Sequence, residues 1–325
     1  MRHAFRSLAR SPRFVATARF TSRAALRSLC AALLAGLFGT AQASPAYDAA
    51  FALLTGHHFP EAESALRRVV QAEPANAAAY HALSRAIMAG VPVENPGKEE
   101  MEARMKDIAQ CLARASELEP TNAAYLRDFG MSQITGMTSI KKGRLIIEQA
   151  LILNPKDSEA HSFLAAIYGT APWMLGGDKE KAAEHRRAFQ ELDPPRFALD
   201  EINRLLWIDR KFPDAFSYCE ELLKKNPRDA VNHYLYGYVA ATAKTNLERG
   251  LTSLKEALTL PCPTPSGNSP YSQPFMATPS NFWEKIGEIE GQLGHAEASR
   301  TAFAKAVELD ASNYWAAKAL VKLKS

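Results

Sequence analysis

The 325-residue sequence predicts an all-α solenoid, in which about seven pairs of helices stack in chain order and one further helix covers the C-terminal end. Three observations lead to this prediction. The chain is rich in alanine, leucine and glutamate, which favour helix, and prolines that end helices recur along it. Small residues stand twelve positions before six of the seven predicted ends of second helices. Together these features describe helical pairs that must stack to bury their apolar faces.

The first 43 residues have the order of a secretory signal. Seven arginines and no acidic residue precede an apolar run over residues 29–38, and Ala41-Gln42-Ala43 follows it. An apolar run this short does not span the hydrocarbon core of a bilayer as a helix. We expect cleavage after Ala43, export to the bacterial periplasm and no stable membrane insertion of the mature chain. An arginine-rich mitochondrial transit peptide is the alternative.

Removal of this segment changes the charge balance of the chain. The whole sequence carries 39 lysines and arginines against 35 acidic residues, and the loss of seven arginines turns a net charge of +4 into −3. The remaining basic residues form no cluster of the kind that binds nucleic acid. Residues 44–325 are therefore expected to form the solenoid without a nucleic-acid partner.

The boundaries of the helical pairs follow from the points where the second helices end. Five of these ends lie at Pro74, Pro120, Pro155, Pro194 and Pro227, because proline does not continue a helix, and two more lie near Cys262 and Ala311. The predicted repeats span approximately residues 44–76, 77–122, 123–157, 158–196, 197–229, 230–262 and 280–312. Asn313 is expected to cap a final helix over residues 313–324.

A second regularity lies twelve residues before these ends, where the second helix must approach its partner closely. The positions hold Ala62, Ile108, Gly143, Ala182, Ala215, Gly250 and Ser299, and six of the seven residues are small. The first helices have Ala50, Ser84, Gly130, Ala165, Gly237 and Gly287 at the corresponding crossing. Only Arg204 breaks the rule, so the first helix of the fifth repeat is the least regular.

Residues 282–310 show the repeat pattern most completely. Trp283 is followed by Ile286 and Gly287, and Phe303 follows after a turn. This spacing resembles the tetratricopeptide repeat, a helix-turn-helix unit of about 34 residues. The resemblance covers nearly all of the mature chain and implies a right-handed superhelix.

The resemblance is specific for fold and unspecific for function. Members of this superfamily serve mostly as adaptors and binding platforms. The stretch APWMLGGDKEKA, residues 171–182, and the closing half of the chain are similar to uncharacterised exported bacterial members.

The resemblance also places the first helices on a concave wall. Side chains three before, one after and four after each small crossing residue are then expected to be exposed there. The predicted partner-binding residues are His81, Arg85, Met88, Arg127, Met131, Tyr234 and Tyr238. The tyrosines would supply rigid apolar contact, and the arginines would orient anionic groups.

Two insertions carry further candidates for contact. Trp173, Met174 and Leu175 form an apolar cluster that either packs on its own repeat or forms a contact patch. Residues 261–280 are too rich in proline for a helix and form either an ordered crossing or a mobile flap. Tyr271 and Phe275 lie in this second insertion.

No catalytic constellation stands out in the sequence. Residues 90–98 lack the glycine spacing and the Ser/Thr of a phosphate loop, and no G-x-S-x-G occurs. No two histidines of the mature chain stand four residues apart. Cys111, Cys219 and Cys262 are expected to be free thiols. We expect no enzyme activity, no cofactor and no metal.

These observations favour a non-enzymatic protein that holds a polypeptide or an envelope partner in the groove of the solenoid. Two alternatives stay open: a small-molecule-binding accessory of an envelope transporter, and a mitochondrial adaptor. An enclosed pocket under Tyr271 and Phe275 would favour the small molecule, whereas an open groove with exposed aromatic residues would favour a peptide. The identity of the partner and the oligomeric state do not follow from the sequence.

Overall fold

The computed structural model describes residues 44–91, 97–135, 139–262, 269–271 and 277–323. The predicted leader, residues 1–43, and Phe275 lie outside the described residues. Within these ranges the chain forms helices and no strands, and none of the helices is long and apolar enough to cross a membrane.

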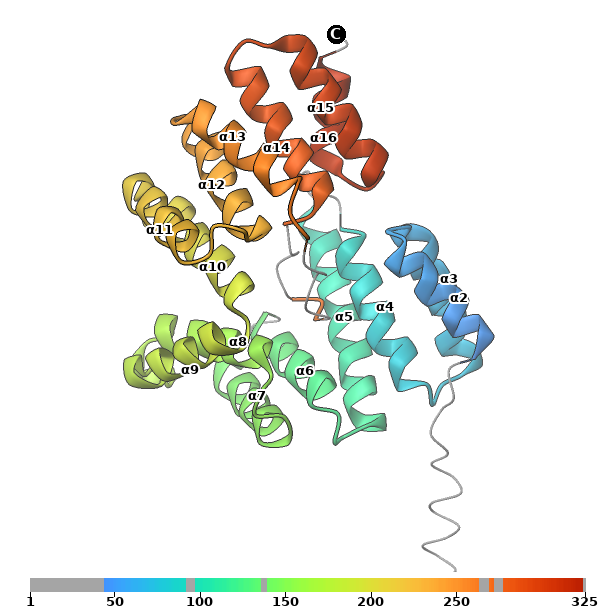
Figure 1. Cartoon of the computed structure of the whole chain (residues 1–325). Helices are drawn as coiled ribbons and strands as arrows, with labels where there is room; N and C mark the ends of the chain where they lie inside the picture. The colour runs from blue at the N-terminus through green and yellow to red at the C-terminus, as the bar shows by residue number, and fades with distance from the viewer. Residues whose placement is uncertain (1–43, 92–96, 136–138, 263–268, 272–276, 324–325) are drawn as a thin grey trace, which may run out of the picture. The chain divides into compact units, whose positions relative to one another are not determined.

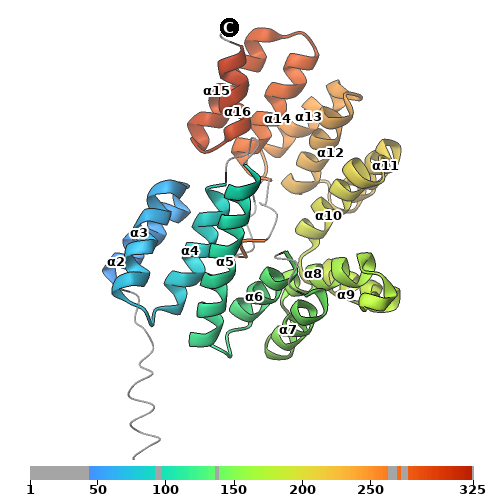
Figure 2. The same cartoon turned by 180° about the vertical axis from the view of Figure 1, so that it is seen from behind.

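The helices follow one another in pairs, which Figure 1 shows from one side and Figure 2 from behind. The pairs are α2 (Pro45–Thr55) with α3 (Phe59–Ala72), α4 (Ala77–Ala89) with α5 (Lys98–Leu118), α6 (Ala123–Thr135) with α7 (Ile140–Leu153), α8 (Ser158–Thr170) with α9 (Lys179–Leu192), α10 (Pro194–Asn203) and the π-helix η2 (Arg204–Ile208) with α11 (Phe212–Lys225), α12 (Ala230–Ala243) with α13 (Leu247–Ala257), and α14 (Pro279–Gln292) with α15 (Ala296–Leu309). The 3₁₀ turn η1 (Trp173–Leu175) lies between α8 and α9, and α16 (Tyr314–Lys322) follows the last pair. The predicted all-α solenoid of helical pairs is confirmed.

Short polar side chains begin many of these helices. Asn76 accepts a hydrogen bond from the backbone N–H of Ala79 at 3.0 Å, and Asp157 does the same for Ala160. Asn313 accepts from the N–H of Ala316, so the predicted cap of the last helix is present. Each cap satisfies a backbone donor that has no partner within its own helix.

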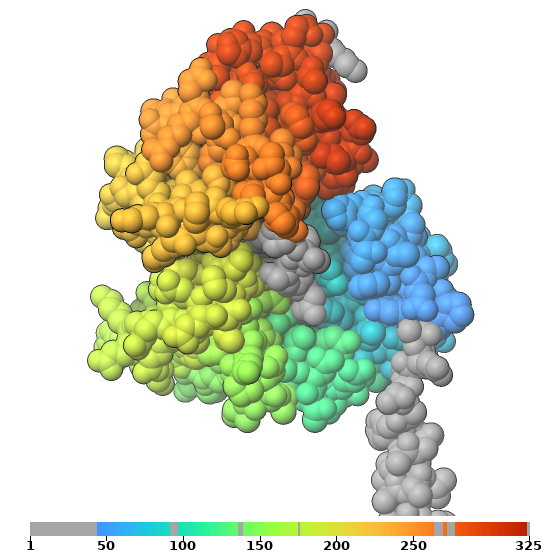
Figure 3. Space-filling model, in the orientation of Figure 1, coloured from blue at the N-terminus to red at the C-terminus, as the bar shows by residue number. Residues whose placement is uncertain are grey.

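The small residues at the helix crossings permit close contact of backbones. A Cβ atom added at Gly143 would lie 2.5 Å from the carbonyl oxygen of Gly130, a distance that real Cβ atoms do not tolerate. The fourth pair is more open, because a Cβ atom at Gly169 would lie 3.7 Å from the Cβ of Ala182. Figure 3 shows the same face as Figure 1 in space-filling form, with the helical pairs coloured in chain order from blue to red.

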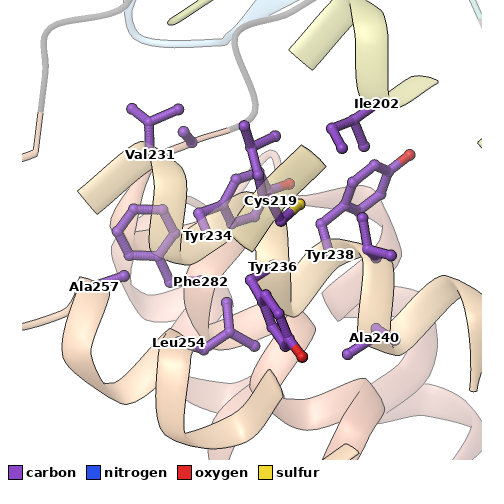
Figure 4. Packing of buried hydrophobic residues seen from close by; sticks show 14 of the residues in the cluster. Ile202, Cys219, Val231, Tyr234, Tyr236, Tyr238, Ala240, Leu254, Ala257 and Phe282 are labelled. Atoms are coloured by element: carbon purple, nitrogen blue, oxygen red, sulfur yellow. The ribbon is translucent and has the colours of Figure 1, made fainter. Parts of the chain in front are cut away.

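The largest buried apolar cluster belongs to the fifth, sixth and seventh pairs. Figure 4 shows Tyr234, Tyr236 and Tyr238 of α12 among the labelled members of this cluster. The three predicted free thiols are confirmed, and Cys219 is a fully buried member of the same cluster.

Successive pairs do not all pack equally closely. The second helix of each pair packs against the first helix of the next, but α9 and α10 make the least extensive contact of these junctions. The helix α10 also contacts α12 of the following pair. The junction between the fourth and fifth pairs is therefore where the regular stacking is loosest.

Candidate functional site

A pocket of about 850 Å³ lies at this loose junction and is lined by α8, α9, α10, η2 and α12. One wall consists of small residues of the fourth pair: Ala165, Ala166, Gly169, Ala182 and Ala183. Because α10 does not cover these residues closely, their apolar surface stays open. Ala166 and Gly169 are exposed to solvent.

The opposite wall is formed by a local change of helical geometry. The chain passes from the α-helix α10 into the π-helix η2 at Arg204. Single π-turns inside helices occur frequently at functional sites, because they move side chains out of the regular helical positions. Here Trp207 and Ile208 follow, and they are 51% and 76% exposed at the edge of the pocket. Arg210 then takes a left-handed backbone conformation, with φ +57°, before α11 begins.

A short hydrogen-bond chain fixes the aromatic part of this wall. Nε1 of Trp207 donates to the hydroxyl of Tyr238 at 3.0 Å, and this hydroxyl donates to Oδ1 of Asn203 at 3.1 Å. Burial raises the pKa of Tyr238, so its hydroxyl stays protonated and remains a donor at neutral pH. The indole ring is thus held at a defined orientation while half of its surface faces solvent.

Paired charges line the remaining side of the pocket. Arg186 of α9 pairs with Glu201 of α10, and Arg204 pairs with Glu201 at 2.5 Å and with Asp209. Arg186 also lies over the ring of Phe197, with its Cζ atom 4.7 Å from the ring centroid. Burial lowers the pKa of Arg186. The pocket therefore offers an apolar wall of small residues, an exposed aromatic edge and charged groups of both signs.

Two of the predicted groove residues are instead members of a buried ionic network. Arg127 is 3% exposed and pairs with Asp128 at 2.9 Å, with Asp157 at 2.8 Å and with Glu159 at 2.9 Å. Nε2 of His81 lies 2.8 Å from Asp128. The prediction that His81 and Arg127 are exposed on a groove is wrong, because both are buried and paired with carboxylates of α6 and of the start of α8.

The two predicted tyrosines also differ from expectation. Tyr234 is fully buried, with Tyr238 stacked at 6.0 Å and Phe282 at 5.3 Å between ring centroids. Tyr238 is 6% exposed and is one of the residues that line the pocket. Exposure of Tyr234 is therefore a wrong prediction, whereas Tyr238 does belong to the lining of a cavity.

The other predicted groove residues are partly buried. Arg85 lies with Cζ 5.8 Å from the ring centroid of Phe51, and burial lowers its pKa. Met88 packs against the apolar cluster of the first pairs, and Met131 packs against that of the third and fourth. None of these three lines the pocket at the fourth pair, and their role in binding stays a prediction.

The insertion residues fall into different environments. Trp173 and Met174 are 82% and 75% exposed, so they do not pack on their own repeat, and of Leu175 only the backbone is described. Tyr271 packs against the apolar cluster of the first pairs. At this residue the insertion is in contact with distant helices. Residues 263–268 and 272–276 of this insertion lie outside the described residues, so the choice between an ordered crossing and a mobile flap stays open.

Sequence reasoning missed the residues that build the pocket edge: Asn203, Trp207 and Ile208. The signal was Arg204, the one large residue at a crossing position of a first helix. Its departure from the rule marks the place where the α-helix becomes a π-helix. Among the described residues, no group of three or more His, Cys, Asp or Glu side chains is arranged to hold a metal ion.

No protein-family model and no curated protein matches the sequence. Among solved structures, a tetratricopeptide repeat protein from Parabacteroides merdae ATCC 43184 is similar over 86% of this chain and 96% of its own, with 17% identity and a TM-score of 0.43. Yeast Tom70 is similar over 86% of this chain and 53% of its own, with 13% identity and a TM-score of 0.52. This chain has the tetratricopeptide-repeat fold. At these identities the tetratricopeptide-repeat likeness concerns the fold alone, and this chain spans about half of Tom70.

Proposed function

We propose that the chain is a non-enzymatic binding protein that holds a segment of a polypeptide in the pocket between its fourth, fifth and sixth helical pairs. The observation that carries this proposal is the pocket of about 850 Å³ with Trp207 and Ile208 exposed at its edge. Exposed aromatic and large aliphatic side chains beside a cavity are typical of the centres of protein interfaces.

The arrangement favours a polypeptide because the pocket is open and two large apolar side chains of its lining, Trp207 and Ile208, are exposed to solvent. An apolar side chain of a partner fits against Ala166 and Gly169, while its neighbours in the partner lie across Trp207 and Ile208. Arg186 and Arg204 lie within reach of carbonyl or carboxylate oxygens of the partner. Their own acidic partners keep these guanidinium groups neutralised when the pocket is empty.

A small molecule is the second candidate, and the volume of the pocket favours it. Ligand pockets commonly measure about 300–1,000 Å³, and this pocket lies within that range. A small molecule that fills the cavity would contact the same lining, Ile208 included. The chemical nature of the ligand, a polypeptide or a small molecule, therefore separates the two candidates.

We also propose that the protein works outside the cytoplasm, in the bacterial periplasm, after removal of residues 1–43. The basic segment, the apolar run and Ala41-Gln42-Ala43 support export, and a mitochondrial adaptor is the alternative. Sequencing the N-terminus of the protein from the envelope fraction tests this proposal, and a mature chain that begins at Ser44 is expected. A chain that retains residues 29–38 would contradict it.

Site-specific photo-crosslinking tests the polypeptide proposal in cells. A photoreactive phenylalanine analogue replaces Ile208 in one variant and Val321 in another, since Val321 is 71% exposed on α16 and far along the chain from the pocket. We expect crosslinks from position 208 to a recurrent polypeptide segment, and none to that segment from position 321. A small molecule that co-purifies with the protein, together with no polypeptide crosslink at position 208, would contradict the proposal.

A further inference from the structure

A rigid loop between α8 and α9 presents two large apolar side chains to solvent. Trp173 and Met174 form the tip of the 3₁₀ turn η1 and are 82% and 75% exposed. They stand outside the pocket described above. A loop that served only to connect two helices would gain nothing from a tryptophan and a methionine at its tip.

Several specific contacts hold the loop in one conformation. Gly176 has φ +92°, a left-handed backbone that favours glycine. Gly177 approaches the carbonyl of Ala171 so closely that any Cβ atom would collide with it. Nη1 of Arg144, on the neighbouring helix α7, donates to the carbonyl oxygen of Gly176 at 2.8 Å. The N–H of Asp178 donates to the carbonyl of Tyr168 at 2.9 Å, and the carboxylate of Asp178 then caps α9. These contacts fix the backbone of the loop in the conformation in which Trp173 and Met174 are exposed.

The size of the tip argues against a protein partner. Even if both side chains became fully covered, they would bury about 400 Å², because large side chains of this kind bury about 150–250 Å² each. A stable protein interface buries about 800 Å² on each partner. A lipid bilayer needs no complementary surface, and a small convex apolar tip enters its interfacial region directly.

The charges around the tip fit a membrane with anionic lipids. Lys141 and Lys142 are exposed at the start of α7, and Lys141 stands one helical turn before Arg144, which contacts the loop. Lys179 is exposed directly after the loop, and Glu180 is an exposed acidic residue beside it. Basic residues near a bilayer surface are attracted to anionic lipids. Tryptophan also prefers the level of the lipid headgroups.

We propose that Trp173 and Met174 insert into the interfacial region of a bilayer that contains anionic lipid, and that Lys141, Lys142 and Lys179 bind its headgroups. This contact is peripheral and reversible, because two side chains and three lysines give only weak attachment. It places the protein at a membrane surface.

Vesicle flotation tests the proposal with the purified protein. The probes are vesicles of phosphatidylcholine alone and vesicles that also contain phosphatidylglycerol. We expect binding to the anionic vesicles, weakening as salt is raised, and at least a tenfold lower partition coefficient for Trp173→Ala/Met174→Ala. The matched control is Trp315→Ala, since Trp315 is also exposed, and it should bind like the wild type. Lys141→Glu/Lys142→Glu should weaken binding without touching the apolar tip.

Three outcomes would overturn the proposal. Failure of the wild type to bind anionic vesicles at any lipid concentration tested is the first. Equal binding of the wild type and the Trp173→Ala/Met174→Ala variant is the second. Dependence of a protein partner on these two side chains, in the absence of lipid, is the third and would assign the tip to a protein interface. Because the pocket plays no part in these measurements, their failure leaves the polypeptide proposal intact.

Discussion

Nη1 of Arg127 lies 2.8 Å from a carboxylate oxygen of Asp157, and this buried contact joins the third helical pair to the fourth. The network continues in both directions. Asp128, which follows Arg127, pairs with His81 of the second helical pair. Glu159, two residues after Asp157, pairs with Arg196 of the fifth helical pair at 2.9 Å. Burial alone would raise the pKa of Asp128, but Arg127 and His81 outweigh burial and lower it. Four successive pairs thus share one ionic network.

Replacement of Arg127 should destabilise the fold strongly. Arg127→Met leaves buried carboxylates without their cation, and breaking a buried pair in this way costs about 3–5 kcal/mol. The free energy of unfolding in urea measures the loss. The control is Arg67→Met, because Arg67 pairs with Glu63 and Asp107 where its side chain is 43% exposed, and this variant should lose under about 1 kcal/mol. Similar losses in the two variants would show that the buried network does not support the stack.

Two glycines predict opposite effects of the same substitution. Gly143→Ala places a Cβ atom 2.5 Å from the carbonyl oxygen of Gly130, so we expect a loss of about 1–3 kcal/mol from overpacking. Gly169→Ala meets only the Cβ of Ala182 at 3.7 Å, and alanine favours helix over glycine by about 0.5–1 kcal/mol. Thermal unfolding should therefore show a lower midpoint for Gly143→Ala and an unchanged or higher one for Gly169→Ala. Midpoints in the reverse order would show that the crossing is assigned to the wrong residues.

Two tyrosines of α12 predict opposite effects of removing a hydroxyl group. The hydroxyl of Tyr234 is buried and has no hydrogen-bond partner among the described residues, so Tyr234→Phe should preserve or raise stability, by about 1 kcal/mol. Tyr238→Phe removes the acceptor of Trp207 and the donor to Asn203, and should cost about 1–2 kcal/mol. Urea unfolding of both variants measures the difference. Equal destabilisation by the two changes would contradict the described environment of Tyr234.

A histidine pair predicts a pH dependence in the fourth pair. Nδ1 of His161 and Nδ1 of His185 lie 2.9 Å apart, which one proton can bridge but two cannot. Burial, and then the neighbouring His161, lowers the pKa of His185. Because the pKa of His185 is lower in the folded than in the unfolded chain, the folded state is fully stable above the unfolded pKa of about 6.5. Stability is lost as the pH falls below this value, because the unfolded chain then binds the proton more readily.

The urea midpoint of unfolding of the wild type should therefore decrease when the pH is lowered from 7.5 to 5.5. His185→Gln removes the second imidazole, so this variant should lose less stability over the same interval. His58→Gln, at an exposed histidine, should behave like the wild type. A wild-type fall that His185→Gln reproduces in full would assign the pH dependence to other groups.

The fold was predictable from the sequence because its signals are local. A proline ends a helix wherever it stands, and a small residue at a crossing is needed whichever neighbour follows. The burial of Arg127 and Tyr234 depends on which helices come to lie against them. Asp128, adjacent to Arg127, was the available sign that this arginine has a partner within the chain.

The pocket was not predictable from the sequence, because it lies where α9 and α10 pack least closely. The small residues Ala165 and Ala182 were identified as crossing residues, but their exposure results from the position of α10 relative to α9. The edge of the pocket comes from the π-turn at Arg204, for which the sequence offers only one large residue at a crossing position of a first helix. Trp207 and Ile208 then become an exposed edge instead of part of the core.

The central claim is that a polypeptide segment occupies the pocket. It is tested most directly by measuring how tightly pocket-filling variants bind the segment that crosslinks at position 208. Ala166→Trp fills the pocket from an exposed position of α8, and Ala304→Trp adds the same side chain at an exposed position of α15. With both variants confirmed as folded by circular dichroism, we expect Ala166→Trp to bind the segment at least tenfold more weakly, about 1.4 kcal/mol, and Ala304→Trp to bind it like the wild type. Unchanged binding by Ala166→Trp would contradict the claim that the polypeptide occupies this pocket.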